Sequence, residues 1–140
     1  MSHIGSQSVP LVAIVDDELD IVTYLSLALE DHGFRVVTIS DSDEAIEKLA
    51  AVRPDVICLD LLMPKRTGVA LYAEILCHER LRNCPIVIMS GLTSEDQLPI
   101  VLEEAGNLPL PMCFLEKPIK IERLLEVLRR HLRMEQGAAT

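Results

Sequence analysis

The feature that most constrains the fold is an alternation of short apolar runs with longer stretches in which apolar residues recur at helical spacing. Continuous apolar runs rich in β-branched residues are typical of strands covered on both faces. The runs predict strands at 9–16, 34–39, 55–60, 85–90 and 112–117. The stretches between and after them predict helices at 18–33, 41–51, 67–81, 93–106 and 120–134.

This alternation predicts an α/β fold. Parallel strands need long crossover connections, and these place helices on both faces of the sheet. We therefore expect a flavodoxin-like, doubly wound (βα)5 architecture, a five-stranded parallel sheet with strand order 2-1-3-4-5. A chain of 140 residues has the size of one domain. The domain is expected to span 9–134, between flexible segments at 1–8 and 135–140.

Local signals sharpen some of these boundaries. Gly33 stands where a helix end favours a left-handed residue, and Thr67 is a suitable N-cap for the helix that follows. The pattern is weakest at 93–106, because Pro99 disfavours a regular helix interior. The sequence GNLPLP at 106–111 is typical of a loop.

Composition narrows the function classes. The net charge of −9 disfavours direct binding to nucleic acid. No apolar stretch approaches the roughly 20 residues that span a bilayer, and the first residues lack the features of a signal peptide, so we expect a cytoplasmic protein. The cysteines have no metal-binding spacing and are expected to be buried, reduced thiols; they are Cys58, Cys77, Cys84 and Cys113.

Polar residues follow four of the predicted strands. Asp16 and Asp17 end the first strand, Asp60 the third, Ser90 the fourth and Lys117 the fifth. In parallel sheets the carboxyl ends of the strands form the ligand-binding edge. We expect these side chains to converge there.

The residue types suit phosphoryl chemistry. Crowded carboxylates need a cation to remain ionised, and hard oxygen ligands suit Mg²⁺. An aspartate beside Mg²⁺ and a lysine can attack a phosphoryl group and form an acyl phosphate. Each carboxylate alone could equally be a helix-capping or loop residue. The joint pattern favours a site.

The motifs VDD at 15–17, CLDLLMP at 58–64, MSG at 89–91 and FLEKP at 114–118 occur in this order. Over about residues 9–133 the chain resembles the response-regulator receiver domain of two-component signal transduction. The resemblance implies that Asp60 is the phosphoacceptor. It also implies a Mg²⁺ site formed by Asp16, Asp17, Asp60 and the backbone carbonyl of Leu62, with Asp17 as a direct ligand and Asp16 acting largely through water.

The resemblance also implies roles for the last two motifs. Lys117 would contact the phosphoryl group and precede a cis peptide bond to Pro118. Ser90 would be the switch hydroxyl, and Phe114 would turn inward when Ser90 moves. The implied phosphodonor is a phosphohistidine on a histidine kinase or a histidine phosphotransfer protein. The chain would be a signalling switch rather than an enzyme, apart from its part in its own phosphorylation and autodephosphorylation.

Two features of the sequence bear on partners and on the lifetime of the phosphorylated state. The segment from Ser90 to Lys117 is longer than usual, so we expect a dedicated effector on the 91–130 face; a phosphorylation-dependent homodimer stays open. The resemblance also implies that the positions of Leu62 and Leu92 flank the path of the hydrolytic water; leucine side chains offer no hydrogen bond to orient that water, which predicts slow autodephosphorylation.

Three alternatives remain at this point. A flavodoxin-like cofactor binder would need a phosphate loop where DDELD stands at 16–20, and a Mg²⁺-dependent phosphatase would need a second acid two residues after Asp60. The third is a receiver-like docking module that acts without phosphorylation.

Overall fold

The computed structural model describes residues 9–63 and 67–132. Its strands are β2 (Leu11–Val15), β3 (Arg35–Ile39), β4 (Val56–Asp60), β5 (Ile86–Ser90) and β6 (Cys113–Glu116). Its helices are α1 (Leu19–Asp31), α2 (Ala45–Val52), α3 (Gly68–Cys77), α4 (Leu98–Glu104) and α5 (Ile121–Leu132), with a 3₁₀ turn, η1 (Ser42–Glu44), before α2. The predicted segments 1–8 and 135–140, and the end of the helix predicted at 120–134, lie outside the described residues.

The strands form one parallel sheet in the order β3-β2-β4-β5-β6, which confirms the predicted order 2-1-3-4-5. The register pairs Val15 with Leu59, Asp60 with Met89, and Ser90 with Glu116. Neighbouring strands therefore end at nearly the same level. This register brings the residues that follow β2, β4, β5 and β6 to one edge.

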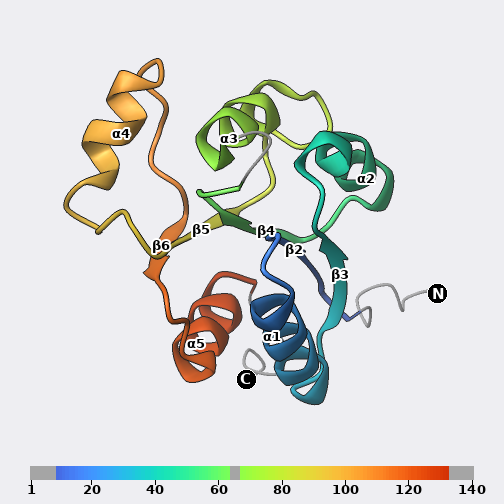
Figure 1. The fold of residues 1–140 in the computed structure, drawn as a ribbon. Coiled ribbons are helices and arrows are strands. Elements are labelled where there is room, and N and C mark those ends of the chain that lie inside the picture. Colours follow the sequence, from blue (N-terminus) through green and yellow to red (C-terminus); the bar gives the residue numbers. More distant parts are fainter. Residues whose placement is uncertain (1–8, 64–66, 133–140) are drawn as a thin grey trace.

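Helices cover both faces of the sheet (Figure 1). On one face, α1 and α5 pack their buried leucines and valines against Val12, Ile14 and Cys58. On the other face, α2, α3 and α4 pack against the alternate strand residues, such as Ala13 and Ile57. Burial on both faces explains why the central strands are continuously apolar.

Two helices differ from their predicted extents. The helix predicted at 67–81 ends at Cys77, and Leu81 lies in a following turn where it is nevertheless fully buried. The helix predicted at 93–106 is only Leu98–Glu104. It begins so that Pro99 lies in the first turn, where the missing N–H has no helical partner to lose.

The start of α3 lies directly against the end of β4. Thr67 caps the helix, because its Oγ1 accepts a hydrogen bond from the Ala70 N–H at 3.1 Å. The Gly68 N–H donates to the carbonyl of Leu61 at 2.8 Å. A Cβ at Gly68 would overlap the carbonyl oxygen of Asp60. Only glycine therefore permits this close approach, which holds the end of β4 in place.

The cysteines only partly match the prediction. All four are free thiols, and Cys58 is buried, but Cys77 is exposed at the end of α3. The expectation that every thiol is buried is therefore wrong for Cys77, which lies outside the buried face formed by Leu71, Tyr72 and Ile75, and Cys84 and Cys113 are only half-buried. Within the described parts of the chain, no helix is long and apolar enough to cross a membrane.

Candidate functional site

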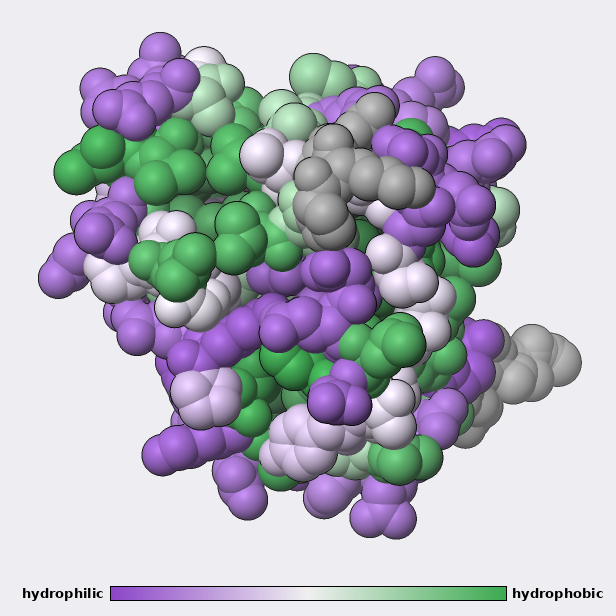
Figure 2. Space-filling view, in the orientation of Figure 1, coloured by the Kyte–Doolittle hydropathy of each residue, from purple (hydrophilic) through white to green (hydrophobic). Residues whose placement is uncertain are grey.

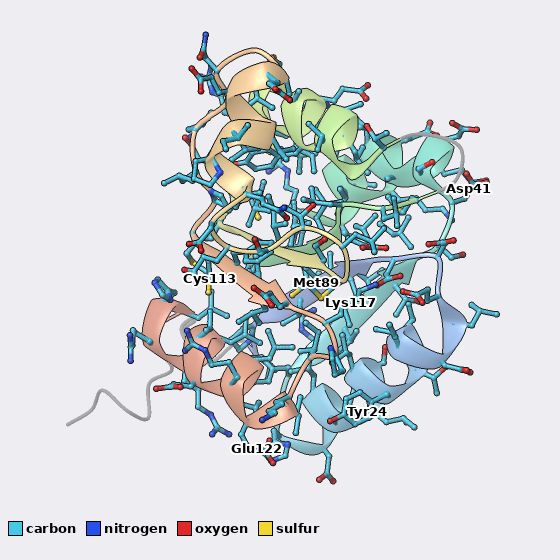
Figure 3. All side chains as sticks on the ribbon, turned by 60° about the vertical axis from the view of Figure 1, so that its left-hand side comes forward. Tyr24, Asp41, Met89, Cys113, Lys117 and Glu122 are labelled. Carbon is cyan, nitrogen blue, oxygen red and sulfur yellow. The ribbon has the colours of Figure 1, made fainter. Side chains whose placement is uncertain are left out.

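The polar residues singled out from the sequence meet at the carboxyl edge of the sheet. Asp16 and Asp17 directly follow β2, Asp60 and Ser90 are the last residues of β4 and β5, and Lys117 directly follows β6. Figure 3 shows Lys117 near the middle of the molecule, between the two layers of helices. The convergence expected from the strand ends is present in the structure.

Three of these residues form a carboxylate cluster. One oxygen from each of Asp16, Asp17 and Asp60 lies within 4.8 Å of the others. Asp16 is fully buried, Asp60 is 1% exposed, and Asp17 is half-buried. Water therefore screens little of the repulsion between Asp16 and Asp60.

The protonation of Asp60 reflects this crowding. Burial raises the pKa of Asp60, and the neighbouring charge of Asp16 raises it further, to about 6. The Leu62 N–H, which donates to Asp60 Oδ1 at 3.2 Å, and the Lys117 ammonium both oppose this rise. The negative charge of the clustered carboxylates therefore exceeds the positive charge that Lys117 supplies.

Lys117 supplies the cation within the site. Its Nζ lies 2.6 Å from Glu18 Oε1, 2.9 Å from Asp16 Oδ2 and 3.4 Å from Asp60 Oδ1. Burial alone would lower the pKa of Lys117, but the nearby carboxylates of Glu18 and Asp16 outweigh burial and raise it. The ammonium stays charged at neutral pH. The peptide bond from Lys117 to Pro118 is cis.

The donor set fits a small divalent cation. Carboxylate oxygens are the ligands that Mg²⁺ prefers. Asp16 Oδ2 is buried, and within the described residues it has an ion pair with Lys117 but no contact with full hydrogen-bond geometry. This oxygen retains the capacity to bind a ligand or a metal-bound water.

Ser90 has a local structural partner in this conformation. Its side chain is buried, and its Oγ accepts hydrogen bonds from the N–H groups of Leu92 at 3.2 Å and Thr93 at 2.9 Å. These bonds shape the loop after β5. Phe114, on β6, is half-buried and packs against the core beneath α2, α3 and α4.

An open cavity of about 730 Å³ leads from solvent to the carboxylates. It is lined by Asp17, Glu18, Ile21, Asp60, Leu62, Met63, Gly91, Leu92, Lys117 and Pro118. In Figure 2 hydrophilic residues form a band across the middle of the visible face, with hydrophobic residues on either side. The side chains of Leu62 and Leu92 are 57% and 75% exposed, so they form an apolar rim.

Sequence reasoning assigned no role to Glu18, although this residue makes the shortest contact with Lys117. The available signal was its position directly after Asp17, at the same strand end. Its side-chain pairing with a residue 99 positions away could not be read from that position alone.

Known proteins share both the sequence pattern and the fold. Residues 12–129 match the family described as "Response regulator receiver domain". The alkaline phosphatase synthesis transcriptional regulatory protein PhoP of Bacillus subtilis is 30% identical over 119 residues, which are 85% of this chain and 48% of PhoP. The transcriptional regulatory protein PrrA of Mycobacterium tuberculosis is 30% identical over 131 residues, 94% of this chain and 53% of PrrA.

The chain thus spans about half the length of these curated relatives. Among solved structures, the chemotaxis response regulator CheY4 of Vibrio cholerae superposes with a TM-score of 0.76 at 30% identity, covering 88% of this chain and 98% of CheY4. The family match covers most of the chain, and the fold and the carboxylate cluster agree with it. The chain belongs to the response regulator receiver domain family of two-component signalling proteins.

Proposed function

We propose that this receiver domain is a phosphoacceptor switch in which Asp60 accepts a phosphoryl group in a Mg²⁺-dependent reaction. The surroundings of Asp60 carry the proposal. Asp60 is 1% exposed, is clustered with Asp16 and Asp17 within 4.8 Å, lies 3.4 Å from the Lys117 ammonium, and borders an open cavity. A buried carboxylate with a cation on one side and metal ligands on the other is suited to nucleophilic attack on phosphorus.

The metal ligands are proposed from the same cluster. Asp17 and Asp60 would bind Mg²⁺ directly, the backbone carbonyl of Leu62 would complete the protein ligands, and Asp16 would act through a bound water. When present, Mg²⁺ supplies positive charge against the transferring oxygens. The same charge would keep Asp60 ionised despite its raised pKa.

The proposed donor of the phosphoryl group is a phosphohistidine. A carboxylate oxygen of Asp60 forms a bond to phosphorus while the P–N bond to the donor imidazole breaks. The electron pair of that bond stays on the imidazole nitrogen. Lys117 donates a hydrogen bond to a phosphoryl oxygen, and Asp60 becomes an acyl phosphate. Receiver domains interact with histidine kinases or phosphotransfer proteins, and we propose such a protein as the donor.

The proposed response begins at Ser90. Its hydroxyl would leave the N–H groups of Leu92 and Thr93 and donate to the phosphoryl group. This exchange frees the loop after β5, and Phe114 would then turn further into the core against which it already packs. The surface formed by α4, β6 and α5 would change, which shifts the population of a state that binds an effector.

Receiver domains are signalling switches rather than conventional enzymes, but their acyl phosphate can hydrolyse. Leu62 and Leu92 border the proposed phosphoryl site and offer no side-chain hydrogen bond to an attacking water. We expect slow autodephosphorylation. Replacing both leucines with glutamine should shorten the half-life of the phosphorylated chain, measured by intact-protein mass over time. An unchanged half-life in the double variant contradicts this role.

The proposed function is tested by intact-protein mass after incubation with Mg²⁺ and phosphoramidate. The wild-type chain should gain one phosphoryl mass, and Asp60→Asn or chelation of Mg²⁺ with EDTA should abolish the gain. A known receiver domain serves as the positive control for the donor. No gain in a folded wild-type chain would refute phosphotransfer and favour a receiver-like docking module that acts without phosphorylation.

A further inference from the structure

The Lys117 ammonium makes its shortest contact with a residue outside the carboxylate cluster. Glu18 Oε1 lies 2.6 Å from Nζ, whereas Asp16 Oδ2 lies at 2.9 Å and Asp60 Oδ1 at 3.4 Å. An ammonium group has three N–H donors, so three carboxylates can occupy all of them. Only the contact with Glu18 has full hydrogen-bond geometry, so a phosphoryl group arriving on Asp60 would compete with Glu18 for the best-formed contact of Lys117.

The three contacts differ in what their loss costs. Asp16 is fully buried and Asp60 is 1% exposed, so removing Lys117 from either would leave a buried carboxylate without its cation. The side chain of Glu18 is 56% exposed, and water can hydrate its carboxylate after release. Glu18 is therefore the contact that Lys117 can give up most readily.

The backbone of Glu18 is held independently of its side chain. Its N–H donates to Asp16 Oδ1 at 2.9 Å, and its carbonyl accepts from the Val22 N–H at 3.0 Å in the first turn of α1. The side chain borders the open cavity. Rotation of this side chain alone can release Lys117, without any movement of α1 or β2.

We propose that Glu18 is a positioning residue that occupies Lys117 in the unphosphorylated chain and competes with the phosphoryl group for it. This inference rests on the proposed function of Asp60. During transfer Lys117 keeps its contact with Asp16, releases Glu18 to water, and donates the freed N–H to a phosphoryl oxygen. Glu18 thereby sets the donor concentration at which Asp60 becomes phosphorylated.

The test compares three variants by the initial rate of phosphorylation over a range of phosphoramidate concentrations in Mg²⁺. Glu18→Gln removes the charge that holds Lys117, and Glu18→Asp keeps the charge but shortens the side chain by one methylene. Asp20→Asn is the matched control, because Asp20 is an exposed carboxylate in the same first turn of α1. Binding of beryllofluoride, a phosphoryl mimic, is measured by calorimetry on the same proteins.

Both Glu18 variants should lower the half-saturating donor concentration and the dissociation constant of beryllofluoride by about two- to fivefold, the range that an exposed ion pair supports. The limiting rate and the Asp20→Asn variant should be unchanged. An equal effect of Asp20→Asn, with none from Glu18→Asp, would show a general charge effect and overturn the inference. A higher half-saturating donor concentration in the Glu18 variants would also overturn it, because Glu18 would then orient Lys117 toward the phosphoryl group.

The two proposals fail in different ways. A wild-type chain that takes up no phosphoryl group refutes the proposed function, and the inference falls with it. Uptake by the wild type with no response to either Glu18 substitution refutes the inference alone.

Discussion

Replacing Asp60 with asparagine is expected to stabilise the metal-free fold at neutral pH. The ionised Asp60 carboxylate is buried beside Asp16, and its pKa is raised from 3.8 to about 6. A difference of this size corresponds to about 3 kcal/mol at a pH above both values, since one pKa step is worth about 1.36 kcal/mol. Asparagine has nearly the same shape and no charge. We therefore expect Asp60→Asn to gain about 1–3 kcal/mol at pH 7.5.

The contribution of Asp60 to the stability of the fold should fall as the pH rises. Between pH 3.8 and about 6, the folded chain holds a proton on Asp60 that the unfolded chain has lost. The unfolded state then binds fewer protons, so the contribution of this group to stability falls as the pH rises through that window. The difference between Asp60→Asn and the wild type should be smallest near pH 4 and largest above pH 7.

The assay is urea denaturation followed by circular dichroism, with EDTA present, at a series of pH values from 4 to 8. The wild type and Asp60→Asn share every other titrating group, so their difference reports Asp60 together with its electrostatic coupling to Asp16 and Lys117. A variant that is equally or less stable than the wild type at pH 7.5 would refute the reasoning. If the proposed metal site is correct, added Mg²⁺ should stabilise the wild type more than the variant. The difference between their free energies of unfolding should then become smaller.

Other substitutions test contacts elsewhere. Lys117→Ala leaves Asp16 buried without its cation and should lower the free energy of unfolding by about 3 kcal/mol in EDTA. An unchanged urea midpoint would show that the ion pair does not stabilise the fold. Tyr72→Phe removes the hydrogen bond that the Tyr72 hydroxyl donates to the Pro109 carbonyl at 2.6 Å, and we expect a loss of about 1 kcal/mol with faster amide exchange in residues 107–112. Unaltered exchange there would show that this bond does not anchor the segment. Cys77 is exposed, whereas burial raises the pKa of the other three thiols. One thiol should therefore react rapidly with a disulfide reagent at pH 8. The Cys77→Ser variant should lose this rapid reaction. Rapid labelling that persists in Cys77→Ser would refute the assignment.

The sheet and its functional edge could be predicted from the sequence because both depend on local patterns. Apolar runs of strand length alternate with helical patterns, and this alternation admits few topologies other than a parallel sheet with crossovers. Asp16, Asp60, Ser90 and Lys117 directly end or follow strands, so any correct assignment of the strands places them at one edge. No detail of side-chain packing was needed for that conclusion.

Helix boundaries were less predictable, because apolar spacing reports burial rather than backbone hydrogen bonding. Leu81 is fully buried, and it therefore extended the apparent helical pattern, although it lies in a turn beyond the end of α3. Pro99 counted against a helix, although its place in the first turn of α4 is compatible with one.

The sequence by itself determined which residues are brought to the carboxyl edge; only the tertiary structure decided which of them pair. Lys117 lies 99 residues from Glu18, and Tyr72 lies 37 residues from Pro109. Each pairing depends on where a side chain ends relative to a distant backbone, and on how much water reaches it. Asp16 is buried and Glu18 is exposed, so water can replace Lys117 at Glu18 far more easily than at Asp16. That distinction arises from the packing of whole elements, which no local pattern in the sequence encodes.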